Sequence, residues 1–476
     1  MAGPDRSELN EVLAFVQRQA EDYLTSLDER AVRAPGADEA ADSFDEPLPE
    51  TGDGALKALS LLQDQGLEAA VHSSGPRFFH FVIGGTTPAA MGADMFGSVV
   101  DQNPGMWLGS PLGGKLETLS IRWLLDLFRL PASWGGVLTT GATMANYVGL
   151  AAARRWWADR HGIDVDEQGL ASLPQIPLLS SGYIHASSIK TSAMLGIGRA
   201  NVQRFERDDV GRLDLEALEK ALLQLDGAPA IIVANAGEVN AGDFDPIDQM
   251  AELAERYECW LHVDGAFGLF ARLSDKTSHL ARGIERADSV TADGHKWLNI
   301  PYDCGFAFLK NPTLLQGVFG LSAAYLTSRG ERPNVGFVSP ESSQRARGLT
   351  VWATLKAYGR DGYREIIERG LDLAQHIGHL VDEAPDLERL ADVQLNIVCF
   401  RFNPGGLSEE QLNELNTKLG NAMLDDGRVY VGTTTYGGRI AFRPALVNWR
   451  TSEADVELLI DVLRELGAGL RAELDG

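Results

Sequence analysis

The sequence predicts an α/β protein in which a large domain with a mostly parallel sheet precedes a smaller carboxyl-terminal α/β domain. Three apolar runs, at residues 231–234, 260–263 and 306–309, are each bordered by Gly, Asp or Pro and alternate with helical patterns. Such runs are typical of parallel strands that are buried on both faces. The chain has 476 residues, 44% of them hydrophobic, which suffices for two or three domains with cores of their own.

The amino-terminal region predicts helix rather than strand. Apolar side chains recur at spacings of three and four through residues 7–30, which describes an amphipathic helix whose apolar stripe needs a partner. A second subunit could be that partner. An acidic stretch with Pro and Gly follows at residues 35–54, and because it has few apolar residues we interpret it as a surface linker.

The carboxyl-terminal third predicts a second, smaller α/β unit. A helical pattern at residues 351–358 leads to apolar runs at 396–402 and 439–442, and an amphipathic helix from about Glu453 closes the chain. We therefore expect an amino-terminal helical segment at residues 1–95, a large domain at 96–355 and a small domain at 356–476.

Charge and cysteine content exclude several classes of function. Lys and Arg number 42 against 67 Asp and Glu, a net charge of −25 that repels nucleic acids and anionic lipid surfaces. The three cysteines lie far apart without CxxC spacing, which argues against a disulfide framework or a zinc site and favours a reducing compartment. With no signal-peptide pattern at the amino terminus and no apolar stretch of about 20 residues, we expect a cytoplasmic protein without membrane or nucleic-acid partners.

Lys296 stands in the segment 291–300, TADGHKWLNI, between a histidine and a tryptophan. A lysine chosen at random is a solvated surface cation, because lysines are seldom buried. In a dry site beside aromatic and imidazole groups, however, the neutral amine is favoured, and the neutral amine is the form that attacks an aldehyde carbon.

Asp264 ends the apolar run LHVD at residues 261–264, and small residues follow it. It could simply cap a turn or a helix. A carboxylate at the carboxyl end of a strand nevertheless lies where ligands bind in open α/β sheets, and there it could keep the nitrogen of a pyridine ring protonated. Ala266, two residues on, would face the same side of an extended strand and is small enough to lie against a flat ring.

Two further segments supply an anion site and an imidazole. Gly141, Ala142 and Thr143 join an apolar run to a helical pattern, and free backbone N–H groups at a helix start bind anions such as phosphate. Small residues before a helix also occur for packing reasons alone. His185, in YIHASSIK, could stack on a pyridine ring opposite Ala266, although a lone histidine is more often structural.

Together these segments resemble the pyridoxal-phosphate-dependent group II amino-acid decarboxylases, the family of the aromatic-L-amino-acid, glutamate and histidine decarboxylases. The resemblance rests on HVDGA at 262–266, HKW at 295–297, the histidine before the serine pair at 187–188, and SPLGGKLETL at 110–119. It extends over roughly residues 70 to 450. It implies an aspartate-aminotransferase-like fold (fold type I) with the cofactor pyridoxal 5'-phosphate, and a homodimer with active sites at the interface. It also implies that Lys296 carries the cofactor as a Schiff base, Asp264 binds the ring nitrogen, His185 stacks on the ring, and Ala142, Thr143 and His295 line the phosphate side.

The sequence departs from the family pattern at several positions. Asp293-Gly294 replaces the Asn-Pro often found before His-Lys, and Gly237-Glu238-Val239 replaces Gly-Thr-Thr in the ring-binding loop. The stretch that matches the aromatic-substrate pocket carries Gly84 and the polar run 101–103, so we do not expect an aromatic substrate from the resemblance. Arg443 could pair with a substrate carboxylate, although an arginine on a small-domain strand is as often structural.

The resemblance implies decarboxylation of an L-amino acid to an amine. Oxidative deamination to an aldehyde and transamination are rivals on the same cofactor. A non-catalytic cofactor-binding module is disfavoured because the chain has no basic helix-turn-helix segment. In the resembling enzymes a mobile loop supplies a tyrosine that protonates the α-carbon, but the corresponding stretch, about residues 327–345, has no tyrosine, and Tyr325 lies just before it. Either another group donates the proton, or slow protonation leaves room for an oxidative side reaction.

Overall fold

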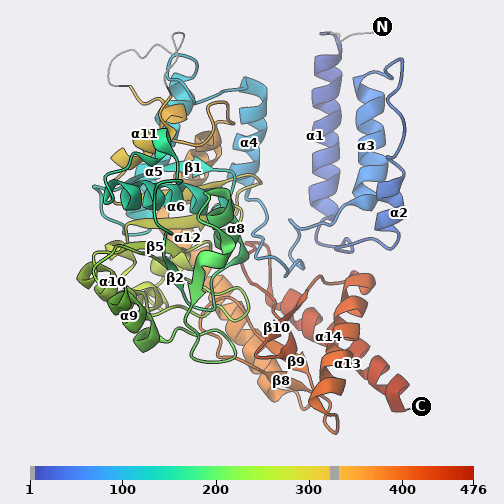
Figure 1. Cartoon of the computed structure of the whole chain (residues 1–476). Helices are drawn as coiled ribbons and strands as arrows, with labels where there is room; N and C mark the ends of the chain where they lie inside the picture. Colours follow the sequence, from blue (N-terminus) through green and yellow to red (C-terminus); the bar gives the residue numbers. More distant parts are fainter. Residues whose placement is uncertain (1–5, 322–331, 476) are drawn as a thin grey trace.

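The computed structural model describes residues 6–321 and 332–475 and contains two β-sheets (Figure 1). The larger sheet has seven strands in the order β1-β7-β6-β5-β4-β2-β3. In chain order these strands are β1 Gly135–Thr139, β2 Leu178–Ser180, β3 Val202–Arg204, β4 Ile231–Asn235, β5 Trp260–Asp264, β6 Ser289–Asp293 and β7 Gly305–Leu309.

The three apolar runs expected to be strands are β4, β5 and β7, but the direction expected for the third is wrong. Strands β2 to β6 run parallel to one another, whereas β7 lies between β1 and β6 and is antiparallel to both. All five residues of β7 are buried, as are those of β4 and β5. Burial on both faces gives the same apolar composition whichever way the strand runs, so composition could not reveal the reversal.

Helices cover both faces of the larger sheet, and β4 shows how alternate residues divide between them. Ile231 and Val233 belong to the core beneath one layer, whereas Ile232 and Ala234 belong to the core on the other side. The first layer contains α6 (Ala142–Asp159), α7 (Val165–Gln168), α8 (Ala186–Met194) and α11 (Thr313–Phe319), and the second contains α5 (Pro111–Leu127), α9 (Leu215–Gln224), α10 (Ile247–Arg256) and the first part of α12 (Arg347–Glu383). Helix α4 (Pro88–Val100) packs on α12.

The smaller sheet is antiparallel, in the order β10-β11-β9-β8, and the strands and closing helix predicted for this region are confirmed. Helix α12 kinks at Gly359, where φ is 60°, and continues from the larger sheet to the smaller one (Figure 1). The elements here are β8 Leu387–Arg389, β9 Phe400–Phe402, α13 Glu409–Asp426, β10 Thr433–Tyr436, β11 Arg439–Phe442 and α14 Glu453–Asp475.

The amino-terminal helices stand apart from both sheets (Figure 1). Helix α1 (Glu8–Ser26) packs beside α3 (Ala55–Ala69) but buries none of its own residues, so its apolar stripe is left uncovered. Leu9 and Leu13 are about 60% exposed. The expected linker at residues 35–54 is wrong in part, because a short helix, α2 (Ala37–Asp42), forms there and packs on α3.

The three cysteines, Cys259, Cys304 and Cys399, are buried free thiols. In the described ranges, no helix has the length and hydropathy to cross a bilayer. The same residues contain no cluster of His, Cys, Asp or Glu suited to a metal ion.

Glu117, on α5, is a carboxyl group buried inside the protein. It is 3% exposed; its Oε1 accepts a 3.3 Å hydrogen bond from the backbone N of Leu138, and its Oε2 lacks a hydrogen-bond partner among the described residues. Burial raises the pKa of Glu117 to about 7, although the Leu138 N–H and the charge of Arg347 act in the opposite direction.

Glu117 should make the protein less stable as the pH rises. The folded-state pKa lies above the ordinary value of 4.5, so folding favours the protonated carboxyl group. The contribution of this group to the unfolding free energy is therefore complete below about pH 4.5 and is lost as the pH approaches 7. In Glu117→Gln we expect the fall in unfolding free energy between pH 5 and pH 8 to be smaller by about 2 kcal/mol. Urea unfolding at both values measures it, with the exposed Glu365→Gln as control. An equal fall in wild type and Glu117→Gln would contradict the prediction.

Candidate active site

A cavity of about 420 Å³ lies at the carboxyl ends of β4, β5 and β6, beside the first turns of α6 and α8. Ligands bind at this edge in open α/β sheets. The structure brings together there all eight residues that the sequence predicts for the site: Gly141, Ala142, Thr143, His185, Asp264, Ala266, His295 and Lys296.

Lys296 points into this cavity from the loop after β6. Its Nζ lies 3.9 Å from Asp293 Oδ2 and 5.3 Å from the centre of the Phe267 ring, and its side chain is 16% exposed. The expected dry, partly aromatic surroundings are therefore present. The aromatic neighbour is Phe267, however, because Trp297 is fully buried in the core beside Phe270 and does not line the cavity.

Asp264 ends β5 as a buried, hydrogen-bonded carboxylate. Its Oδ2 accepts hydrogen bonds from Asn146 Nδ2 at 2.8 Å and from Ser188 Oγ at 3.2 Å. Burial alone would raise the pKa of Asp264, but the electrostatic interaction with His185, which is protonated only at low pH, the Asn146 hydrogen bond and nearby charges together lower it below its ordinary value. Asp264 is therefore ionised at neutral pH and can hold a proton on a neighbouring nitrogen.

Ala266 lines the cavity from a turn and not, as expected, from an extended strand. Strand β5 stops at Asp264, and the next residues turn, with Ala266 N donating to Asp264 Oδ1 at 3.2 Å. The two side chains are thus not related by strand alternation. Both nevertheless line the cavity.

His185 is the N-cap of α8, which fixes its ring. Its Nδ1 accepts from the backbone N of Ser187 at 3.2 Å and lies 2.7 Å from Ser187 Oγ. The ring is exposed to the open cavity, yet enough protein surrounds it for burial to lower the pKa of His185. The imidazole is therefore neutral at pH 7.

The first turn of α6 presents backbone N–H groups to the cavity. The N-cap residue is Gly141, so the helix has no side-chain cap, and Ala142 N donates to Asp293 Oδ1 at 2.9 Å. Burial raises the pKa of Asp293 to about 7. Burial likewise lowers the pKa of His295 to about 4, so its Nδ1, 3.3 Å from Asp293 Oδ1, is neutral at pH 7 and forms no ion pair.

A network beneath the cavity was not expected from the sequence. Asn146, on the cavity side of α6, joins Asp264 to His262: its Oδ1 lies 2.9 Å from His262 Nε2 and accepts from Thr291 Oγ1 at 2.9 Å. His262 precedes Asp264 by two residues on β5, so strand alternation was the available signal for it. The network fixes the position of Asp264.

The other cavity residues include an isolated cation and an anion. Arg443 follows β11, is 8% exposed, and its Nη1 is buried without a hydrogen-bond partner among the described residues. Burial lowers its pKa, and the charge of Glu238 acts in the opposite direction. Further lining residues are Phe81, Val82, Thr140, Met144, Tyr183, Ser187, Asn235, Gly237, Val239, Phe267 and Asp293.

Residues 74–87, here called the strap, cross the back of the Lys296 loop and bind the carboxyl-terminal region. At Gly84 a Cβ atom would lie 1.8 Å from the carbonyl oxygen of Lys296, so only glycine fits. Two backbone hydrogen bonds join the strap to the Lys296 loop: Gly84 N donates to His295 O at 3.0 Å, and Thr87 N donates to Asn299 O at 3.0 Å. Two more join it to the carboxyl-terminal region: Phe79 N donates to Tyr430 O at 2.8 Å, and Asn448 Nδ2 donates to Gly75 O at 2.8 Å.

Gly84 and the polar run 101–103, which were expected near the substrate, do not line the cavity of their own chain. Gly84 contacts the Lys296 backbone rather than the cavity, and neither Asp101, Gln102 nor Asn103 lines the cavity of its own chain. Asn103 Oδ1 instead accepts from the backbone N of Gly105 at 3.0 Å. Tyr325 and the first residues of the expected loop, 327–331, lie outside the described residues.

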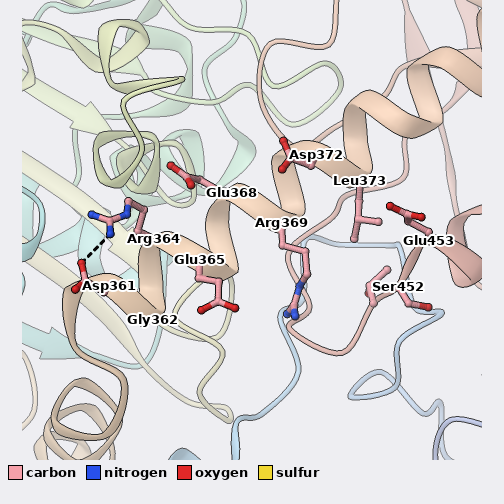
Figure 2. Close-up of a pocket in the computed structure, with 11 residues that line it drawn as sticks. Asp361, Gly362, Arg364, Glu365, Glu368, Arg369, Asp372, Leu373, Ser452 and Glu453 are labelled. Atoms are coloured by element: carbon pink, nitrogen blue, oxygen red, sulfur yellow. Dashed lines mark hydrogen bonds and ion pairs between the residues drawn. The ribbon is translucent and has the colours of Figure 1, made fainter.

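A larger hollow, of about 720 Å³, lies on the surface along α12 (Figure 2). Charged side chains dominate it, and Asp361, whose side chain is 85% exposed, pairs with Arg364 at 2.8 Å. None of the eight predicted site residues lines it. This hollow is a solvated polar surface, and the smaller cavity at the strand ends is the candidate active site.

Comparison with known proteins agrees with this geometry. The sequence model of the pyridoxal-dependent decarboxylase conserved domain matches residues 40–403. The chain is 30% identical over 419 residues to an aromatic-L-amino-acid decarboxylase of Bacillus atrophaeus (86% of this chain, 85% of the relative). It is 27% identical over 463 residues to the acidic amino acid decarboxylase GADL1 of Mus musculus (93% and 82%).

Solved structures confirm the fold class expected from the resemblance. The crystal structure of Oryza sativa TDC with PLP and tryptamine matches with a TM-score of 0.91 and 24% identity, over 99% of each chain. The fold, the strand-end cavity with its lysine, and the family match over residues 40–403 lead to one conclusion: the chain belongs to the family of pyridoxal-dependent decarboxylases, whose cofactor is pyridoxal 5'-phosphate.

Proposed function

We propose that this protein removes carbon dioxide from the α-carbon of an L-amino acid, with pyridoxal phosphate attached to Lys296. One observation carries the proposal: Lys296, the ionised Asp264 and the start of α6 share a single cavity with Arg443, a cation that has no ion-pair partner among the described residues. Aldehyde formation and transamination would use the same lysine and carboxylate, but the two curated relatives described above are named decarboxylases.

The cavity fits the cofactor. Gly141 places no side-chain cap on the first turn of this 18-residue helix, so its dipole and the backbone N–H groups other than that of Ala142, which donates to Asp293, can receive a phosphate. Lys296 supplies an amine for covalent attachment, and Asp264 supplies a buried carboxylate for the ring nitrogen. When bound, pyridoxal phosphate supplies a cationic ring that accepts the electron pair left on the α-carbon.

The protein's own groups then bind, orient and hold protons. Asp264, fixed by Asn146, keeps a proton on the ring nitrogen, because its lowered pKa leaves it anionic. His185 and Ala266, which both line the cavity, would contact the ring as neutral side chains. Arg443 is the cation available for a substrate carboxylate. Positioning and electrostatics of this kind are the protein's share of the rate enhancement.

The exposed surface and the thiols support a proposal for the assembly state and the location. We propose a homodimer in which the uncovered stripe of α1, with Leu9 and Leu13, packs on a second copy. An apolar stripe left in water is otherwise unfavourable. We also propose a cytoplasmic location, consistent with three buried free thiols. We retain residues 1–95, 96–355 and 356–476 as the proposed division.

Product analysis tests the proposed activity. The protein reconstituted with pyridoxal phosphate is incubated with each of the twenty L-amino acids, in air and without oxygen, and carbon dioxide, amine, aldehyde and peroxide are measured. We expect one or a few amino acids to release carbon dioxide and amine, with an aldehyde and peroxide fraction that rises with oxygen if protonation of the α-carbon is slow. Aldehyde or keto-acid formation without amine would contradict decarboxylation as the main reaction.

A further inference from the structure

Arg443 and Glu238 are two ionisable groups of the cavity that no assigned contact with the cofactor uses. Both line the cavity, both are buried, and neither is needed to hold the lysine, the ring nitrogen or the phosphate. Glu238 stands where the resembling enzymes carry the first threonine of Gly-Thr-Thr. This chain therefore has an acidic side chain at a position where the resembling enzymes have a neutral one.

Glu238 cannot turn away from the cavity into water. Its two carboxylate oxygens accept hydrogen bonds from Asn240 N at 2.7 Å and Ala241 N at 2.8 Å, and the residue is 4% exposed. Its backbone closes the same turn, because Glu238 N donates to Asp243 O at 2.7 Å. Gly237 lets the loop lie close to the Phe267 ring, since a Cβ there would lie 2.9 Å from that ring.

Arg443 and Glu238 influence each other without forming an ion pair. Their charges interact, yet no nitrogen–oxygen pair between them lies within the 4.0 Å of a salt bridge, and Arg443 Nη1 has no hydrogen-bond partner in the part of the chain that the structure describes. Arg443 is thus free to bind one carboxylate. Asp243, the neighbouring acid, already pairs with Arg212 at 3.1 Å, whereas Glu238 forms no salt bridge with any cation in the described ranges.

These charges set a limit on the substrate. An amino acid whose only carboxylate binds Arg443 neutralises that cation and brings no further anion towards Glu238. A second carboxylate, on the side chain, would meet the buried carboxylate of Glu238, and among the described residues no second arginine lines the cavity to receive it. Like charges in a buried site repel strongly. We propose that Glu238 is a specificity-determining residue that excludes amino acids with acidic side chains and leaves neutral and basic ones as substrates; this rests on the proposed function.

Ligand binding tests the inference without depending on turnover. Glutarate and its monoamide have nearly the same shape, but only glutarate carries a second carboxylate. Each is titrated calorimetrically into the cofactor-loaded wild type, Glu238→Gln and the matched control Glu365→Gln, which removes the same charge from the hollow of Figure 2. We expect wild type and the control to bind the monoamide at least about tenfold more tightly than glutarate, and Glu238→Gln to reduce that preference to about twofold or less.

A purely structural role for Glu238 predicts a different pattern. If it only closes the turn at residues 238–241, its replacement would weaken both ligands equally, and the preference would persist. Glu238→Thr, whose hydroxyl can still accept one backbone N–H, serves if Glu238→Gln does not fold. An unchanged preference in a folded variant, or no binding of either acid by the wild type, overturns the inference. If no amino acid loses carbon dioxide, the proposed function fails, whereas this titration still decides the role of Glu238.

Discussion

Lys296→Ala should carry no covalently attached pyridoxal phosphate and should lose decarboxylase activity by a factor of about 10³ or more. The reason is geometric as well as chemical. Lys296 is the lysine that lines the cavity, where its amine lies between Asp293 and the Phe267 ring. Borohydride reduction followed by peptide mass analysis locates the attachment, and the absorption band of the bound cofactor should be lost.

Lys310→Ala is the matched control for this experiment. Lys310 has a side chain that is 53% exposed and lies 3.7 Å from Asp288, outside the cavity. It should retain both the bound cofactor and the activity. Reducible, covalently bound cofactor in Lys296→Ala would show that another amine carries it, and the site would then have to be reassigned.

Asp264→Ala should lower kcat by about 10³, whereas His185→Ala should lower it by only about tenfold. Removing the carboxylate leaves no anion to hold the proton on the ring nitrogen, so the ring accepts electrons poorly. Burial holds the pKa of His185 below its ordinary value, so the ring is neutral at pH 7. It therefore contributes contact and position rather than charge.

The comparison requires saturating cofactor and a folding control. Asp264→Ala leaves the amide of Asn146 without its 2.8 Å acceptor, so Asp264→Asn, which keeps the shape and an acceptor oxygen, is measured beside it. Both variants should lose activity alike if charge is decisive. Equal losses in kcat for His185→Ala and Asp264→Asn would show that the carboxylate does not have the role given to it here.

Much of the site could be predicted because its residues follow recognisable ends of elements. Asp264 ends an apolar strand, the 141–143 turn precedes a helical pattern, and the carboxyl ends of parallel strands share one edge of a sheet. Asn146 gave no such signal, since an asparagine inside a helix is usually solvated. Its role depends on Asp264 and His262 of β5 and Thr291 of β6 approaching it together, which only the folded sheet brings about.

The errors have physical causes of the same kind. Direction is invisible in a strand that is buried on both faces, so β7 was expected to be parallel. Trp297, next to Lys296 in sequence, turns into the core, because successive residues of a loop need not share a face. Gly84 was assigned to a substrate pocket, although its lack of a side chain permits contact with the backbone of Lys296.

The strap has a consequence for the order in which the protein matures during synthesis. Residues 74–87 leave the ribosome early, yet they are secured partly by Tyr430 and Asn448, which are translated more than 340 residues later. Contacts so distant in sequence form late, because the entropy of closing the intervening loop must be met first. The strap that packs against the Lys296 loop is therefore not fully secured until translation is almost complete. A nascent chain that ends before Tyr430 should neither retain the cofactor nor resist proteolysis near Lys296.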